Sequence, residues 1–149
     1  MTRSFISGAL AIAASAALAA QTPATRYNRT AEATIAGTIK ALVSYPAADG
    51  GVGVHFDLKT PTGMVSVHVA PAAYLGQENA YFMADDAVEI IGTRVSEEGH
   101  TTFWAKAIQK GSSVLVLRNA DGTPKWTPTS DGTDGCGVNH PPLPRATEY

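Results

Sequence analysis

Residues 52–69, VGVHFDLKTPTGMVSVHV, give the clearest indication of the fold, because they contain two alternating runs joined by a turn. In the first run Val54, Phe56 and Leu58 fall on one face, and in the second run three valines do the same. Alternation with a period of two is typical of a β-strand that is buried on one face. The Pro/Gly content of Thr60–Gly63 between the runs predicts an antiparallel hairpin.

The register of this hairpin follows from pairing its apolar residues across a turn centred between Pro61 and Thr62. The apolar partners that result are Phe56 with Val67, Leu58 with Val65, and Val54 with Val69. A slip of one residue would mismatch all three pairs, so this register is favoured.

Further strands are predicted on both sides of the hairpin by alternation and β-rich composition. The strands are residues 33–44, 87–94 and 101–108, and a last β-rich run, residues 113–117, follows them. The stretch Pro71–Asn79 predicts a short helix that ends near Gly76. This order predicts an all-β fold, a small OB-like five-stranded barrel with a short helix between strands 3 and 4. A small β-sandwich and an SH3-like barrel are the alternative folds.

The chain resembles the exported bacterial OB-fold proteins, small periplasmic barrels often called BOF proteins. The segments that carry the resemblance are Gly37-Thr38-Ile39, His55-Phe56-Asp57-Leu58, Val65-Ser66-Val67-His68-Val69 and Val88-Glu89-Ile90-Ile91-Gly92. Together they cover roughly residues 33–108. The resemblance implies a non-enzymatic binding or stress-envelope role. This chain departs from the compact family form by a longer stretch at 67–75, an extension at 115–126 and a polar tail.

The first twenty residues have the layout of a secretory signal peptide. Arg3 supplies the positive start, an apolar run follows, and Ala17-Leu18-Ala19 offers a cleavage site. We therefore expect a periplasmic or secreted protein, with a retained membrane anchor as the alternative, and we see no further segment able to cross a membrane. The predicted organisation is 1–20 signal peptide, 21–31 flexible leader, 32–126 OB-like β-barrel domain and 127–149 flexible polar tail.

Composition and motifs exclude several function classes. The net charge is -2 and one cysteine is present, and the sequence pI is about 6.0. A basic nucleic-acid binder normally has a pI well above neutral, so DNA or RNA is disfavoured as a partner. A single cysteine excludes an intramolecular disulfide. The chain holds no nucleophile elbow, P-loop or H-E-x-x-H motif, so we expect no enzyme.

The second face of the hairpin carries the main candidate site. The register places His55 opposite His68 and Asp57 opposite Ser66, with Asp57 two residues from His55 on the same face. Two imidazoles and a carboxylate can hold a divalent metal. Because OB folds commonly bind ligands on this hairpin, an anion or a sugar is an alternative. The remaining interpretation is that these side chains are simply solvated.

Two further groups of residues are candidates. Cys136 and His140, four residues apart in the tail, form a plausible soft-metal or haem pair. Aromatic residues could form a stacking platform for sugar or base rings; they are Tyr45, Tyr74, Tyr81, Phe103 and Trp104. One of Phe103 and Trp104 must face outward because adjacent strand residues alternate. Trp126 is expected to pack back onto the domain.

These observations predict an exported, non-enzymatic OB-fold binding protein of the bacterial envelope, with a small ligand or an envelope protein as its partner. The alternatives are a periplasmic metal or haem handling accessory protein and a module that binds single-stranded nucleic acid. The ligand-binding candidates are His55, Asp57, His68, Tyr74 and Trp104, and the metal candidates are His55, Asp57, His68, Cys136 and His140. No cofactor is identified, and a divalent metal is the candidate.

Overall fold

A computed structural model describes residues 27–47, 50–97 and 99–128 of the chain. Its elements in chain order are η1 (Arg29–Ala31), β1 (Ala33–Pro46), β2 (Val52–Thr60), β3 (Gly63–Pro71), α2 (Ala72–Gln77), β4 (Ala87–Glu97), β5 (His100–Lys110) and β6 (Ser113–Val116). The predicted signal peptide and the part of the tail with Cys136 and His140 lie outside the described residues.

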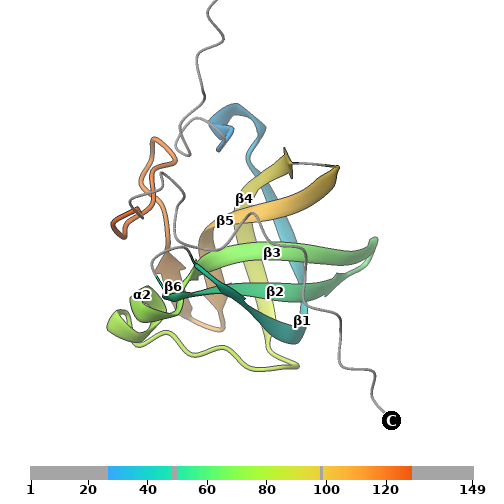
Figure 1. The fold of residues 1–149 in the computed structure, drawn as a ribbon. Coiled ribbons are helices and arrows are strands. Elements are labelled where there is room, and N and C mark those ends of the chain that lie inside the picture. The colour runs from blue at the N-terminus through green and yellow to red at the C-terminus, as the bar shows by residue number, and fades with distance from the viewer. Residues whose placement is uncertain (1–26, 48–49, 98, 129–149) are drawn as a thin grey trace, which may run out of the picture.

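Five of the strands close into a ring (Figure 1). β1 pairs with β2 and β4, β2 pairs with β3, and β4 pairs with β5, each time antiparallel. A parallel pairing of β3 with β5, through Val67–Phe103 and His68–Trp104, closes the ring. With the short helix α2 between β3 and β4, this arrangement confirms the predicted all-β fold class.

The predicted register of the β2–β3 hairpin is confirmed over its central part. Phe56 pairs with Val67, Leu58 with Val65, and His55 with His68 in the structure; Asp57 also pairs with Ser66. The expected pair of Val54 with Val69 is wrong, because the register shifts between Val54 and His55 and Val54 pairs with Ala70. A bulge of this kind bends and twists a strand, which a ring of five strands requires.

The inside of the ring holds the main hydrophobic core. Its fully buried members come from all five strands of the ring and from the segment after β6: Ile39, Phe56, Leu58, Val67, Val69, Ala70, Ile90, Ala105 and Leu117. Tyr74 and Leu75 bring the helix α2 into this core. Phe103 belongs to it as well, so Phe103 faces inward and its neighbour Trp104 faces outward, as strand alternation predicts.

A second, smaller cluster lies on the outer face of the ring. It consists of Tyr27, Val95 and Trp104, all less than a tenth exposed. Tyr27 precedes η1 and lies ahead of the expected domain start at Glu32, so the structured part of the chain includes the last residues of the predicted leader. The outer face is therefore packed rather than open at this point.

The extension after β6 continues beside β5 and then folds back on itself through the antiparallel bridge of Arg118 with Pro124. The Leu117 amide donates to the Lys106 carbonyl, and the Lys125 amide donates to the Leu117 carbonyl. Trp126 is half-buried and packs against the main core, as expected.

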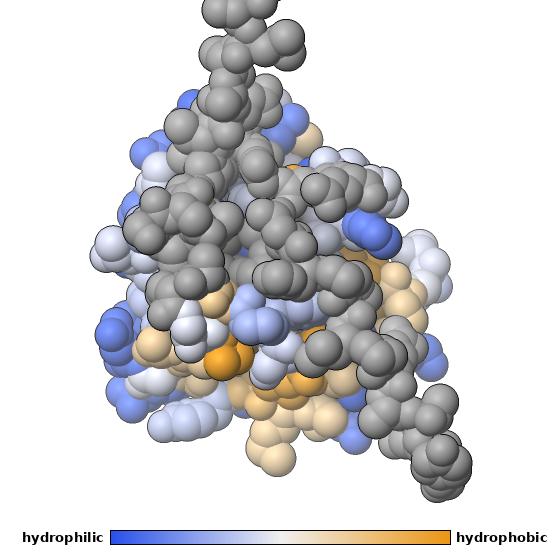
Figure 2. Space-filling model, in the orientation of Figure 1, coloured by the Kyte–Doolittle hydropathy of each residue, from blue (hydrophilic) through white to orange (hydrophobic). Residues whose placement is uncertain are grey.

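Within the described part of the chain no helix is long and apolar enough to cross a membrane. Figure 2 shows a surface of mixed hydropathy, with the hydrophobic residues gathered in the lower half of the view.

Candidate functional site

A column of rings crosses the outer face from β1 to β5. The Tyr45 and His55 ring centroids lie 4.4 Å apart, and those of His55 and His68 lie 4.8 Å apart. His68 stacks on Trp104 with a centroid distance of 4.7 Å and an interplanar angle of 15°. The stacking follows from the ring closure, because the parallel β3–β5 pairing sets His68 beside Trp104. All four side chains are buried, and His68 has no exposed area.

Arg118 continues the column beyond Trp104. Its guanidinium carbon lies 4.9 Å from the Trp104 ring centroid and 5.5 Å from the ring centroids of both Tyr27 and Trp126. The residue is only 1% exposed, and its Nη1 donates a hydrogen bond to the Gly122 carbonyl at 3.2 Å. A buried guanidinium between aromatic faces gains cation–π attraction, which desolvation strengthens. We define the ring column as Tyr45, His55, His68, Trp104 and Arg118.

Two buried polar atoms lie beside the middle of the ring column. Thr93 on β4 pairs across the sheet with Trp104 on β5, and both residues are 1% exposed. Within the described part of the chain, neither the Trp104 Nε1 nor the Thr93 Oγ1 has a hydrogen-bond partner. A buried donor without a partner costs about 1–3 kcal/mol. The face therefore contains a buried N–H donor and a buried hydroxyl that form no hydrogen bond with the described residues.

Burial and nearby carboxylates raise the pKa of two tyrosines around the ring column. Burial raises the pKa of Tyr45, and the negative charge of Asp57 raises it further. The pKa of Tyr27 is raised by burial, by the charge of Glu32 and by the hydrogen bond that the Tyr27 hydroxyl donates to Glu32 Oε1 at 3.2 Å. The charge of Arg118 opposes this rise. The raised pKa favours the neutral phenol in both residues.

The structure brings three of the five ligand-binding candidates into direct contact: His55, His68 and Trp104. Asp57 is half-buried on the same strand as His55 and acts electrostatically on Tyr45. Tyr74 lies on α2, where its ring is 5.3 Å from that of Trp126 and its hydroxyl donates to the Val116 carbonyl. Among the described residues, Trp126 connects Tyr74 to Arg118 of the ring column.

Three of the metal candidates, His55, Asp57 and His68, lie within the described residues, and the other two lie outside them. Among residues 27–47, 50–97 and 99–128, no three His, Cys, Asp or Glu side chains form a group able to hold a metal ion. His55 and His68 provide two imidazoles in contact, while Cys136 and His140 lie outside these ranges. The metal site stays a prediction.

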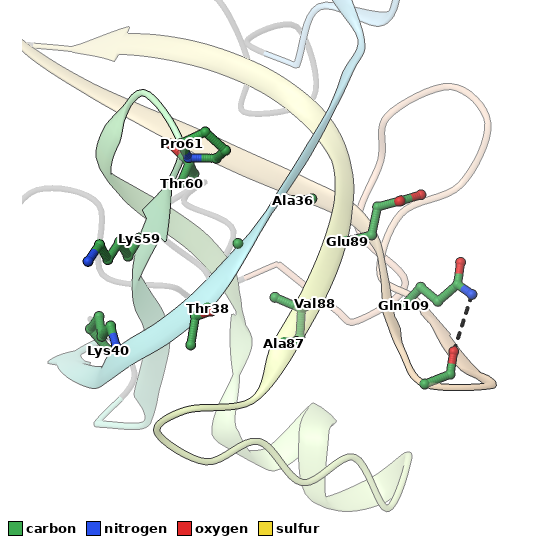
Figure 3. Close-up of a pocket in the computed structure, with 12 residues that line it drawn as sticks. Ala36, Thr38, Lys40, Lys59, Thr60, Pro61, Ala87, Val88, Glu89 and Gln109 are labelled. Atoms are coloured by element: carbon green, nitrogen blue, oxygen red, sulfur yellow. Dashed lines mark hydrogen bonds between the residues drawn. The ribbon is translucent and has the colours of Figure 1, made fainter.

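A groove of about 760 Å³ lies away from the predicted site residues, at the end of the ring near the β2–β3 turn. Figure 3 shows Lys40 and Lys59 on one side of it and Glu89 and Gln109 on the other. Lys40 is paired with Asp85 at 3.5 Å, and both side chains are well exposed. The groove is open and its charges are solvated, so its lysines could attract an anion only weakly.

Sequence reasoning missed Arg118, Thr93 and Tyr27 as parts of the site. Arg118 follows the last β-rich run, and nothing in its neighbours indicates that three aromatic rings enclose it. Thr93 is one of several threonines in strands. The one available signal was alternation, because Trp104 must leave the core if Phe103 enters it.

The comparisons with known proteins place the chain in a bacterial family and support no specific likeness to BOF proteins. No curated protein matches the chain. The model of one family matches residues 31–115, from the end of η1 to β6. That range includes four members of the ring column and excludes Arg118. Since the match covers more than half of its residues, the chain belongs to the MamS/MamX magnetosome protein family.

Proposed function

We propose that this protein is an exported, non-enzymatic binding protein of the bacterial envelope that associates with the magnetosome through a protein partner. The observation that carries the proposal is the ring column on the outer face of β1, β2, β3 and β5. It combines flat apolar rings with buried nitrogen and hydroxyl groups, which is the composition of an interface anchor and not of a plain core.

Two other observations support the proposal. The family name refers to the magnetosome, and the matched range 31–115 contains the strands that carry the rings. The sequence of residues 1–20 predicts export, which would place the domain in the envelope. The proposal of a non-enzymatic role rests on the motif content of the sequence.

Export is tested by the mass of the mature protein. We expect purified protein from the source bacterium to begin at Ala20 or Gln21, because the predicted cleavage site ends at Ala19 or Ala20. A full-length protein that still begins at Met1 and sediments with membranes would contradict export with cleavage.

Association through the ring column is tested with histidine variants of the tagged full chain. His55→Leu and His68→Leu replace each buried imidazole with an apolar side chain, so that the position stays filled and the nitrogen atoms are removed. We expect each variant to fold and to be depleted at least about tenfold from the magnetosome fraction, since 1.4 kcal/mol of lost binding is a factor of ten. His100→Leu is the matched control, because His100 is exposed at the start of β5. Unchanged recovery of both variants would contradict binding through this face.

Metal or haem handling is the second candidate function, and the contact between the His55 and His68 rings favours it. Elemental analysis of the purified full chain beside His55→Ala and His68→Ala tests it. A metal held by the wild type and lost in both variants would support this candidate, since binding requires both imidazoles. Absence of metal from all three proteins would remove it at this site.

A further inference from the structure

The outer edge of β6 carries backbone groups that point away from the rest of the sheet. β5 pairs with β6 on one side, and in the described part of the chain no strand pairs with it on the other. The Leu117 amide donates to the Lys106 carbonyl at 2.7 Å, so the ladder bonds to β5 fall on Leu117 and on every second residue before it. The amides and carbonyls of Val114 and Val116 therefore face outward.

A contact from α2 shows the same direction. The Tyr74 hydroxyl donates to the Val116 carbonyl at 3.2 Å, and Figure 1 shows α2 next to β6. Among the described residues, the Val116 amide and both backbone groups of Val114 have no hydrogen-bond partner. Unpaired backbone groups along a strand edge are a template for a further strand. The edge of β6 can therefore accept one more strand.

The sequence of this edge lacks the features that usually prevent such pairing. Residues 111–117 read GSSVLVL, without a charged residue or a proline. Val114 is 61% exposed and Val116 is 41% exposed. Exposed edges are normally protected by Lys or Pro residues or by a covering element. Two identical uncharged edges do not repel each other, and pairing would remove their valines from water.

A groove of about 590 Å³ lies along the same edge. Val114 and Val116 line it together with Glu78 and Lys125. Both charged side chains are exposed, and neither forms an ion pair with another described residue. Their charges are opposite, so two copies of the groove carry no net charge and do not repel when they meet. The groove thus gives a second strand room beside β6.

The β5–β6 turn of a second copy fits this groove. In an antiparallel pair of β6 strands with its two-fold axis at Leu115, Val114 of one copy lies opposite Val116 of the other. The same register directs the turn residues 111–113 of that copy toward Asn119, which also lines the groove. These turn residues are one glycine and two serines, all small. Serine hydroxyls donate and accept, so they can bond to the carboxylate and the ammonium group of the groove.

We propose that this chain forms a two-fold symmetric dimer in which β6 of one copy pairs antiparallel with β6 of a second copy. Val114 of each copy exchanges two backbone hydrogen bonds with Val116 of the other, so all outward groups of these residues are paired. The valine side chains pack together on one face of the joined sheet. The occupant is a second copy because edge, groove and turn complement one another within this chain. The inference goes beyond the proposed function: it rests on β6, and the rings of the ring column lie on other strands, so either proposal can fail without the other.

The mass of the purified full chain as a function of concentration tests the dimer. We expect the pairing of two such short strands to bury less than the roughly 1,200 Å² of a stable interface, so the association is weak. Sedimentation equilibrium should show monomer in dilute solution and dimer near millimolar concentration. A chain that stays monomeric near millimolar concentration would overturn the proposal.

Amide hydrogen exchange identifies the surface that the dimer uses. Exchange at Val114 and Val116 should slow at least about tenfold between dilute and concentrated solution, because these amides become bonded in the dimer. The Leu115 amide faces β5 and should change little, so it is the internal control. Protection of Val114 and Val116 that does not depend on concentration would mean that the chain's own residues cover the edge. That result contradicts the proposal, as does a dimer in which both amides stay unprotected.

Val116→Pro removes an outward amide of β6 and leaves the bonds to β5 in place, because that amide points away from β5. We expect this variant to raise the Kd of the dimer at least about tenfold. Val116→Ile is the matched control, since it keeps the amide and an apolar β-branched side chain, and it should dimerise like the wild type. Amide spectra of dilute samples verify that each variant is folded.

Val114→Lys tests the same edge through an exposed side chain, so the variant is expected to fold. It places two like charges beside the two-fold axis and should also raise the Kd at least about tenfold. Met64→Lys adds the same charge at an exposed residue of β3 and should leave the Kd unchanged. Dimerisation that survives both Val114→Lys and a folded Val116→Pro would exclude pairing through β6.

Discussion

The inner core of the ring and the ring column on its outer face are both buried, but they differ in chemistry. The inner core is built almost entirely from aliphatic residues and phenylalanines. The ring column consists of a tyrosine, two histidines, a tryptophan and an arginine. Apolar burial of the first kind stabilises a fold without further requirements, whereas buried polar groups need partners. The difference indicates that the inner core maintains the ring, whereas the buried outer face carries polar groups whose partners decide how well it is stabilised.

The inner core should therefore give the largest loss of stability when it is truncated. Phe56 has no exposed area and its ring packs 5.1 Å from that of Phe82. Phe56→Ala is expected to lower the free energy of unfolding by about 3–5 kcal/mol in denaturant titration. Met64→Ala on the same hairpin is the control, because Met64 is 53% exposed. Equal losses in the two variants would break the distinction between core and surface.

The contact between the two faces is tested at Gly92. A Cβ atom there would overlap the Trp104 carbonyl oxygen and lie 2.8 Å from the Phe103 ring, so it disturbs both faces at once. We expect Gly92→Ala to lower the free energy of unfolding by about 1–3 kcal/mol. Gly76→Ala in α2, where a Cβ meets no atom within 4 Å, should instead raise it by about 1 kcal/mol. Thermal and chemical unfolding of both variants measure the difference, and a tolerated Gly92→Ala would show that β4 and β5 can separate.

Arg118→Lys separates stacking from charge on the outer face. Lysine keeps the positive charge and loses the planar group that lies between the aromatic rings. The expected loss of unfolding free energy is about 2 kcal/mol, since desolvated cation–π contacts are worth this much. Arg94→Lys is the control, because Arg94 is exposed and its guanidinium carbon is 5.9 Å from the Phe103 ring centroid. A neutral Arg118→Lys variant would mean that charge alone matters there.

The smallest expected effect is the alkaline pH dependence from Tyr27. Because the fold raises the pKa of Tyr27 above 10.0, the unfolded chain releases this proton first as the pH rises. The stabilisation is complete below about pH 10 and is lost above it. Tyr27→Phe should cost about 1 kcal/mol at neutral pH and lose less stability than the wild type between about pH 9 and pH 11. Tyr81→Phe, at a residue that is 71% exposed, is the control. Parallel pH profiles for wild type and Tyr27→Phe would contradict the assignment.

Much of the fold was predictable because it depends on local alternation. The strand runs, the short helix and the central hairpin register of Phe56 with Val67 all follow from the spacing of apolar residues. The pairing of Val54 with Ala70 was not predictable, because a bulge depends on how the strand must bend to close the ring. The site was predictable in part: the opposition of His55 and His68 follows from the register, and their stacking on Trp104 does not.

The all-β class, the order of the elements and the pairing of His55 with His68 follow from the amino-acid sequence, because they depend on residues that are neighbours along the chain or across one turn. The burial of this pair and its continuation into Trp104 and Arg118 depend instead on the folded chain. That outcome needs the parallel β3–β5 pairing and the return of the extension after β6, which join residues far apart in the chain. Contacts of this kind depend on ring closure, and no local periodicity encodes it.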